Sequence, residues 1–103
     1  MKYLEKLIRK ISAVLKDYAI VQSFTSDSVS INAGSQAQID IPITAPDGYE
    51  AIGPIGLFSS TGFVVAAFYK MQTSNSIRTY MRNTGSSTLT GTVTVRVLFV
   101  HKL

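Results

Sequence analysis

The sequence contains no cysteine and no tryptophan, and its one histidine is His101, close to the end of the chain. Without cysteine there is no disulfide, no thiolate nucleophile and no cysteine-based zinc site. A single histidine argues against the common zinc sites and against a catalytic triad with an imidazole base. We therefore predict no metal and no cofactor, and we interpret His101 as a solvated residue of the chain end.

Charged residues are also scarce. They make up 16% of the 103 residues, while 46% are hydrophobic; an average domain has about 25% charged residues. A domain of this length has a large surface relative to its volume and little charge with which to cover it. We expect part of its apolar surface to be covered by other copies or by a partner, since oligomerisation often replaces disulfides in small domains.

Long apolar runs are absent too. None approaches the roughly 20 residues of a membrane span, and the charged first ten residues are followed by no apolar stretch, so we expect no secretory signal peptide. The net charge is +4, most of it within residues 1–18. Because acidic residues are interspersed there, this is a weak footprint for nucleic acid, and we predict no nucleic-acid binding.

The acidic residues suggest no catalytic site. Asp47 belongs to a Pro-Asp-Gly turn, Asp40 falls on the polar side of an alternating segment, and no calcium-loop pattern is present. The glycine-rich segment 53–56 is followed by neither a helix nor a Lys-Ser/Thr pair, so it is not a phosphate loop. A hydrolase with paired carboxylates would need a sheltered cleft, for which this domain has little room. We predict that the protein is not an enzyme.

Residues 2–18 have the period of an amphipathic helix. Their apolar stripe comprises Leu4, Leu7, Ile8, Ile11, Val14, Leu15 and Tyr18. In heptad terms these residues occupy positions a, d and e, a width that favours a helix with two neighbours over a two-stranded coil. We predict that residues 1–19 form an oligomerisation helix of a homotrimer. Binding to a membrane surface is an alternative, although the stripe lacks a Trp or Phe anchor.

From residue 19 onward the period of the sequence changes to two. Short segments rich in β-branched residues are separated by turn signals every 8–12 residues, as in a sandwich or barrel. The predicted strands are 19–24, 29–32, 37–43, 49–58, 63–72, 77–83 and 89–100. We predict a mainly β chain, in which residues 20–103 form an antiparallel, jelly-roll-like β-sandwich behind the amphipathic helix. Pro42 has no N–H to donate, which suggests an edge strand or a bulge.

One candidate binding face follows from alternation. Arg78, Tyr80 and Arg82 share one side of their strand, and two guanidinium groups beside an aromatic ring suit an anion or a sugar face. An ordinary solvated sheet face explains the same pattern. A second pattern is apolar on both sides, in segment 63–71 and in the last strand, where Leu98 and Val100 follow polar residues. Such strands lie under a second layer or at an intersubunit surface.

Residues 29–100 resemble a small β-sandwich module found in tailed-phage and prophage appendages, namely tail-fibre, baseplate and receptor-binding proteins. The resembling segments are Val-Ser-Ile-Asn-Ala-Gly-Ser at 29–35, Pro-Asp-Gly-Tyr at 46–49, Ala-Ile-Gly at 51–53, Tyr-Met-Arg-Asn-Thr-Gly-Ser-Ser at 80–87 and the Thr/Val-rich strand 92–100. These motifs are turns and strands, so no binding residue is carried over.

The resemblance implies a jelly-roll trimer that is made in the bacterial cytoplasm and located in the virion. Its implied partners are other virion proteins and a host-surface glycan, with a role as a head-fibre, tail or baseplate module in host attachment. The alternative is a stand-alone carbohydrate-binding or adhesion domain. Tail, portal or lysis genes beside the coding gene would favour the first interpretation, and polysaccharide-processing genes the second.

Overall fold

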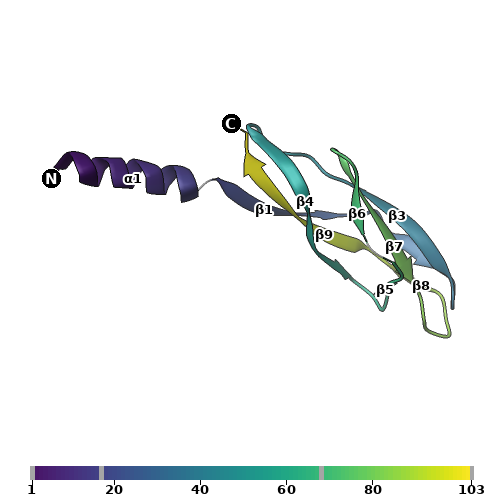
Figure 1. The fold of residues 1–103 in the computed structure, drawn as a ribbon. Helices are drawn as coiled ribbons and strands as arrows, with labels where there is room; N and C mark the ends of the chain where they lie inside the picture. Colours follow the sequence, from purple (N-terminus) through teal and green to yellow (C-terminus); the bar gives the residue numbers. More distant parts are fainter. Residues whose placement is uncertain (1, 17, 68, 103) are drawn as a thin grey trace.

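The computed structural model describes residues 2–16, 18–67 and 69–102, with the backbone alone for residues 12–16. Within these ranges the chain forms one helix followed by strands (Figure 1). The elements are α1 Lys2–Lys16, β1 Ala19–Thr25, β2 Val29–Ile31, β3 Gln36–Pro42, β4 Tyr49–Ser59, β5 Val64–Val65, β6 Lys70–Thr73, β7 Ser76–Arg82, β8 Leu89–Gly91 and β9 Val93–His101.

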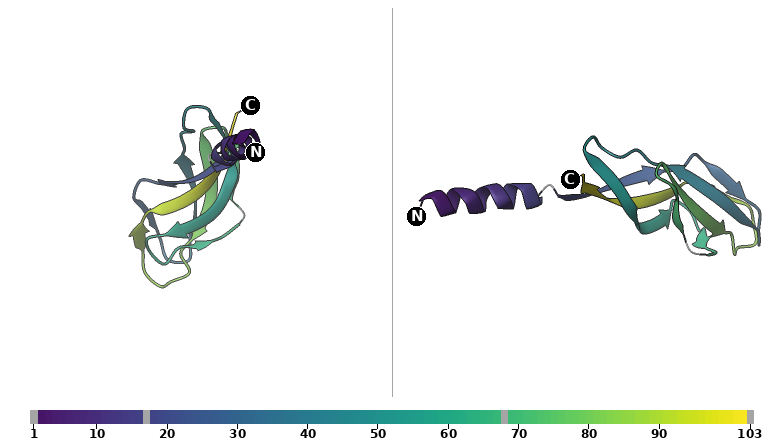
Figure 2. Two further views of the ribbon diagram at one scale, coloured as in Figure 1. Left: turned by 90° about the vertical axis from the view of Figure 1, so that its left-hand side faces the viewer. Right: turned by 45° about the horizontal axis from the view of Figure 1, so that its top comes forward.

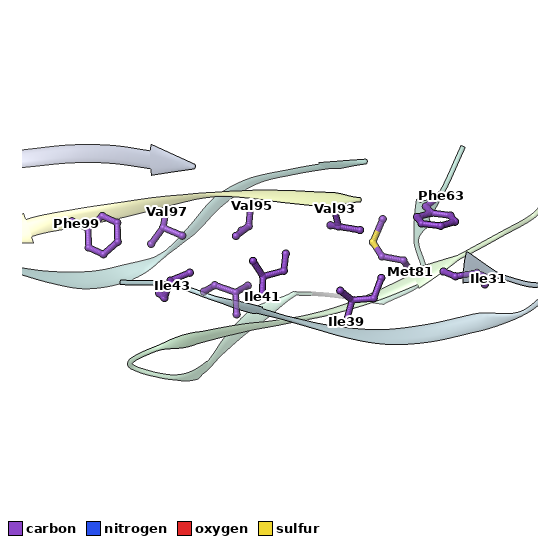
Figure 3. Packing of buried hydrophobic residues seen from close by; sticks show 11 residues of the cluster. Ile31, Ile39, Ile41, Ile43, Phe63, Met81, Val93, Val95, Val97 and Phe99 are labelled. Carbon is purple, nitrogen blue, oxygen red and sulfur yellow. The ribbon is translucent and has the colours of Figure 1, made fainter. Parts of the chain in front are cut away.

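The strands pair antiparallel in three sheets. One has the order β1-β9-β4, another the order β3-β7-β5 with β6 also paired to β7, and β2 pairs with β8. The β1-β9-β4 and β3-β7-β5 sheets pack face to face around one core (Figure 3). The predicted fold class, a mainly β antiparallel sandwich with one N-terminal helix, is confirmed. Pro42 lies in β3, an edge strand, where its missing N–H costs no ladder bond on the open side.

The core is built by strand alternation. Every second residue of β9 points inward, and these side chains face the isoleucines of β3 and the inner side chains of β7 (Figure 3). The four residues 39, 41, 95 and 97, which alternation predicts to be buried, are at most 5% exposed. Burying a side chain of this size contributes about 1.5–3 kcal/mol, so this double row of aliphatic residues is what holds the two sheets together.

Two predicted turns have the same construction. In each, a glycine with positive φ occupies the third position, Gly34 at 70° and Gly48 at 82°. The fourth residue donates its N–H to the carbonyl of the first, over 3.0 Å from Ser35 to Asn32 and 3.0 Å from Tyr49 to Pro46. Glycine adopts this conformation without steric cost, so it sets the direction in which the chain leaves each turn.

Two predicted strands are each divided in the structure. Segment 63–72 forms β5 and β6, because the five residue steps from Val65 to Lys70 lie opposite only three steps of β7, from Met81 to Arg78. The longer side must leave the ladder. Segment 89–100 forms β8 and β9, which belong to different sheets, and the chain crosses between them at Thr92. Such changes of sheet produce the corners of sandwiches.

The helix stands apart from the sandwich. It projects from one end of the molecule, roughly in line with the long axis of the sandwich (Figures 1 and 2), and the chain measures 68 × 22 × 20 Å. The helix ends at Lys16, two residues earlier than predicted, and β1 begins at Ala19. The end of β9 lies at the same end, because the N–H of His101 donates to the carbonyl of Tyr18 over 2.8 Å.

Candidate interaction surfaces

The described side chains of the apolar stripe of α1 are exposed, and no described strand packs over them. The helix itself extends away from the sandwich (Figure 2). The exposed fractions of these side chains are 46% for Leu4, 42% for Leu7, 55% for Ile8 and 50% for Ile11. Tyr18 follows the helix and is 40% exposed. The predicted stripe members Val14 and Leu15 have side chains outside the described residues.

An uncovered stripe of this kind is costly for a free chain. A lone helix of 15 residues is marginally stable in water. The acidic Glu5 in its first turn is favourable at the positive end of the helix dipole, but such contributions are only about 0.3–1 kcal/mol. Packing of the stripe is therefore the main source of stability available to the helix, and the described part of the chain does not supply it.

The candidate binding face lies on β7. Its side chains alternate strictly: Ile77, Thr79 and Met81 are buried in the core, while Arg78, Tyr80 and Arg82 point outward. The structure therefore places the three predicted residues on one outer face. Their cross-strand partners on β3 are polar, with Asp40 opposite Arg78, Gln38 opposite Tyr80 and Gln36 opposite Arg82.

Arg78 is bound to a carboxylate of its own chain. Its Nε donates to Oδ1 of Asp40 over 3.0 Å and its Nη2 donates to Oδ2 over 3.1 Å, a bidentate pair. These hydrogen bonds hold the pKa of Asp40 below its ordinary value and raise the pKa of Arg78 above its own. The amide of Gln38 is 3.4 Å from the same carboxylate. Both charges of the pair are thus satisfied within the chain.

Arg82 differs from Arg78 in its surroundings. It is exposed, lies at the end of β7 between Gln36 and Val64, and forms no ion pair with any residue that the structure describes. Tyr80 beside it is half-buried, so the part of its side chain that is accessible and the guanidinium of Arg82 are what this face offers to a ligand. Sequence reasoning missed Asp40 as the partner of Arg78. Alternation placed Asp40 on a polar face, but which residue lies opposite it depends on the pairing of β3 with β7, which local sequence does not reveal.

The buried polar side chains are structural. In the described residues they are Ser26, Thr79 and Asn83, and no buried side-chain nitrogen or oxygen there lacks a hydrogen-bond partner. Asn83 donates to the carbonyls of Ile31 (2.9 Å) and Ser87 (2.7 Å) and accepts from the N–H of Gly85 (2.9 Å). This explains the Asn-Thr-Gly-Ser motif at 83–86, which shapes the loop between β7 and β8.

Hollows on the surface are shallow. One of about 260 Å³ lies between the β1–β2 loop and β3, and its wall includes Asp27, Gln38 and Asp40. Another, of about 300 Å³, has Tyr49 and Met71 in its wall. Drug-sized ligands usually occupy sites of about 300–1,000 Å³, so these two hollows are at or below the lower end of that range. Across the described residues there is no cluster of three or more metal-binding side chains, and no described helix is long and apolar enough to cross a membrane.

Comparisons with known proteins add no relative. No protein-family model, no curated protein and no solved structure matches this chain. Support for a function therefore comes from the exposed helix stripe, the outer faces of the two sheets and the resemblance of residues 29–100.

Proposed function

We propose that this protein is a non-catalytic structural module that assembles into a homotrimer through α1. The observation that carries the proposal is the stripe Leu4, Leu7, Ile8 and Ile11, in which every side chain is at least 42% exposed and no strand packs over it. Aliphatic side chains at helical spacing are placed in this way when another helix covers them. A second and a third copy of α1 present the matching surface.

The trimer follows from the width of the stripe. Positions a and d alone form the narrow seam of a two-stranded coiled coil, whereas Ile8 extends the seam into position e. A helix with two neighbours buries such a flank against the second neighbour. The basic residues Lys6 and Arg9 lie on the opposite side and stay in solvent, which keeps the bundle soluble.

We place this module in a virion appendage of a tailed phage or prophage, such as a tail fibre, baseplate or head fibre. The support is the resemblance of residues 29–100, which is carried by segments 29–35, 46–49, 51–53, 80–87 and 92–100. Its partners are then other virion proteins, and three copies of the outer face of β7 are presented to the host surface.

The molecular mass of the assembly in solution tests the proposed trimer. Ile11→Asp puts a charge at the centre of the stripe and should convert a trimer into monomers at micromolar concentration, as measured by sedimentation equilibrium. Lys6→Asp is the matched control, since it changes the charge on the solvent side of the same helix and should leave the trimer intact. A monomeric mass for the unmodified chain at the same concentration would refute the proposal.

Attachment is tested on β7. Tyr80→Ala combined with Arg82→Ala removes the two groups that are not engaged by Asp40 and should abolish binding on a glycan array or on host cells. Three linked copies gain from effective concentration, so weak single sites suffice. Arg96→Ala, an exposed arginine on the other sheet, is the control. Equal binding of both variants contradicts a site at β7, and loss of the trimer in the double variant assigns this face to an interface.

A further inference from the structure

The outer face of the β1-β9-β4 sheet changes character along its length. Cross-strand pairs on this face are Ala19 with Val100 and Val21 with Leu98 near the helix, and then Ser23 with Arg96 and Thr25 with Thr94 farther away. Apolar pairs are followed by polar pairs. On β4 the exposed Ile52 follows Ala51, the partner of Phe99, and so lies at the same end, where the exposed Glu50 is the partner of Val100. We call residues 19, 21, 52, 98 and 100 the proximal patch.

No described element covers this patch. The sheet has its core on the other side, and the outer side faces away from β3 and β7 (Figure 3). Val21 is 41% exposed and Ile52 is 55% exposed, while Leu98 and Val100 are half-buried. Antiparallel sheets of lone domains alternate apolar inner with polar outer residues. Along β1 and β9 the distal half of this face follows that rule with Ser23, Thr25 and Thr94, but the proximal half does not. On β4 the distal half carries the exposed Phe58, opposite Thr94.

The position of the patch indicates that neighbouring copies of the chain cover it. This inference rests on the trimer proposed above. Helices in a bundle lie about 8–10 Å apart. Only residues 17 and 18 separate α1 from β1, and the three residue steps from Lys16 to Ala19 span at most about 11 Å. The first residues of β1 in neighbouring copies are therefore held close together at the end of the bundle. The surface at that point is the proximal patch.

The size that a stable interface needs also indicates that a neighbouring copy covers the patch. A stable protein interface uses roughly 20–30 residues on each side, and one face of a helix of 15 residues is well short of this. In the chain, Tyr18, which is 40% exposed, lies between the described stripe of α1 and the proximal patch. We propose that the proximal patches of neighbouring copies pack together and continue the helical interface into the β-domain.

The first test compares two valine substitutions. Val21→Glu charges the patch, and Val64→Glu places the same change on the outer face of the other sheet, where Val64 is 45% exposed. We expect Val21→Glu to weaken trimer association at least about tenfold, and Val64→Glu to leave it unchanged, by sedimentation at several concentrations. Equal association of the two variants would overturn the proposal. If Ile11→Asp still dissociates the trimer in that case, the proposed function stands without the patch.

A second measurement does not depend on a destabilising change. Because the chain has no cysteine, Val21→Cys introduces a single thiol. A bismaleimide with a reach of about 10 Å, the spacing of helices in a bundle, should join neighbouring copies of Val21→Cys into covalent dimers. Val64→Cys should remain uncrosslinked under the same conditions. Crosslinking of Val64→Cys alone, or of neither variant in a sample that sediments as a trimer, rejects the patch as the contact.

Discussion

The two large sheets have equivalent inner faces and contrasting outer faces. Around β7 the outer positions hold Asp40, Arg78 and Arg82, with amides and one tyrosine between them. At the end near the helix, the outer positions of β1 and β9 hold only aliphatic side chains, Val21 and Leu98 among them, and the exposed Glu50 of β4 lies opposite Val100. Both faces are open in the single chain, so the packing within one chain does not account for the difference.

The contrast indicates that the polarity of a sheet's outer face depends on what the face contacts. The β3-β7-β5 sheet follows the apolar-in, polar-out alternation of a sheet that faces water, except at Val64 of β5. The β1-β9-β4 sheet departs from it at Phe58 of β4 and, over several adjoining residues, beside the helix whose own stripe is exposed. Two adjoining apolar surfaces that are uncovered are more simply explained by contact with the same kind of partner than by contact with two different partners.

The largest expected effect tests whether the inner faces are equivalent. Phe99→Ala on β9 should lower the free energy of unfolding by about 3–5 kcal/mol, and Ile41→Ala on β3 by about 2–5 kcal/mol, because each leaves a cavity in the same core. Urea titration followed by circular dichroism measures both. Phe58→Ala, at a position 53% exposed, is the control, and all variants carry Ile11→Asp so that assembly does not contribute. A large loss on one sheet only would contradict a shared core.

A smaller effect compares the buried polar residue that ends each sheet. Asn83→Ala removes three hydrogen bonds and leaves the carbonyls of Ile31 and Ser87 without a partner. Ser26→Ala removes two, one from the N–H of Val93 (2.9 Å) and one to the carbonyl of Asp27 (2.8 Å). An unsatisfied buried group costs about 1–3 kcal/mol, so Asn83→Ala should be the more destabilising by thermal denaturation. The reverse order would show that the 83–88 loop is not held by this amide.

The smallest effect concerns pH and is specific to the polar face. Arg78 lowers the pKa of Asp40, so the pair stabilises the folded chain above the unfolded carboxyl pKa of about 3.9. That contribution disappears as the pH falls through the lower folded pKa. Asp40→Asn should therefore lower the melting temperature slightly at pH 7, and the difference from the unmodified chain should shrink below about pH 4. Glu50→Gln on the other sheet is the control at pH 7, and a difference for Asp40→Asn that persists in acid would contradict the role of the ion pair.

Several features of the fold could be predicted from single residues and their spacing. The period of Leu4, Leu7, Ile8 and Ile11 predicts the helix, and the period of two from residue 37 predicts β3 and its buried isoleucines. Gly34 and Gly48 predict the two turns. The interrupted strands could not be predicted, because their breaks depend on pairing. The ladder breaks between Val65 and Lys70 because β7 offers too few residues opposite that segment, and Thr92 is where one strand changes sheets.

The candidate surfaces, like the fold, could be predicted from the sequence only in part. Alternation along β7 was sufficient to place Arg78, Tyr80 and Arg82 on one side, but the register with β3 decides that Arg78 is held by Asp40 while Arg82 is open. The two-sided apolar character of the last strand was visible at Leu98 and Val100. Its position beside β1 and the helix is a result of the β1-β9 register, which joins residues that are about 80 positions apart in the chain.

The sequence by itself determined the local structure of this protein and the side of each element that is apolar, because helix and strand periods are set by neighbouring residues. It also determined the scarcity of charge and the absence of cysteine that favour assembly. Only the tertiary structure decided which apolar side is buried within the chain and which is left open. Burial depends on which strands pair and how the sheets stack, and these contacts join segments that no local period connects.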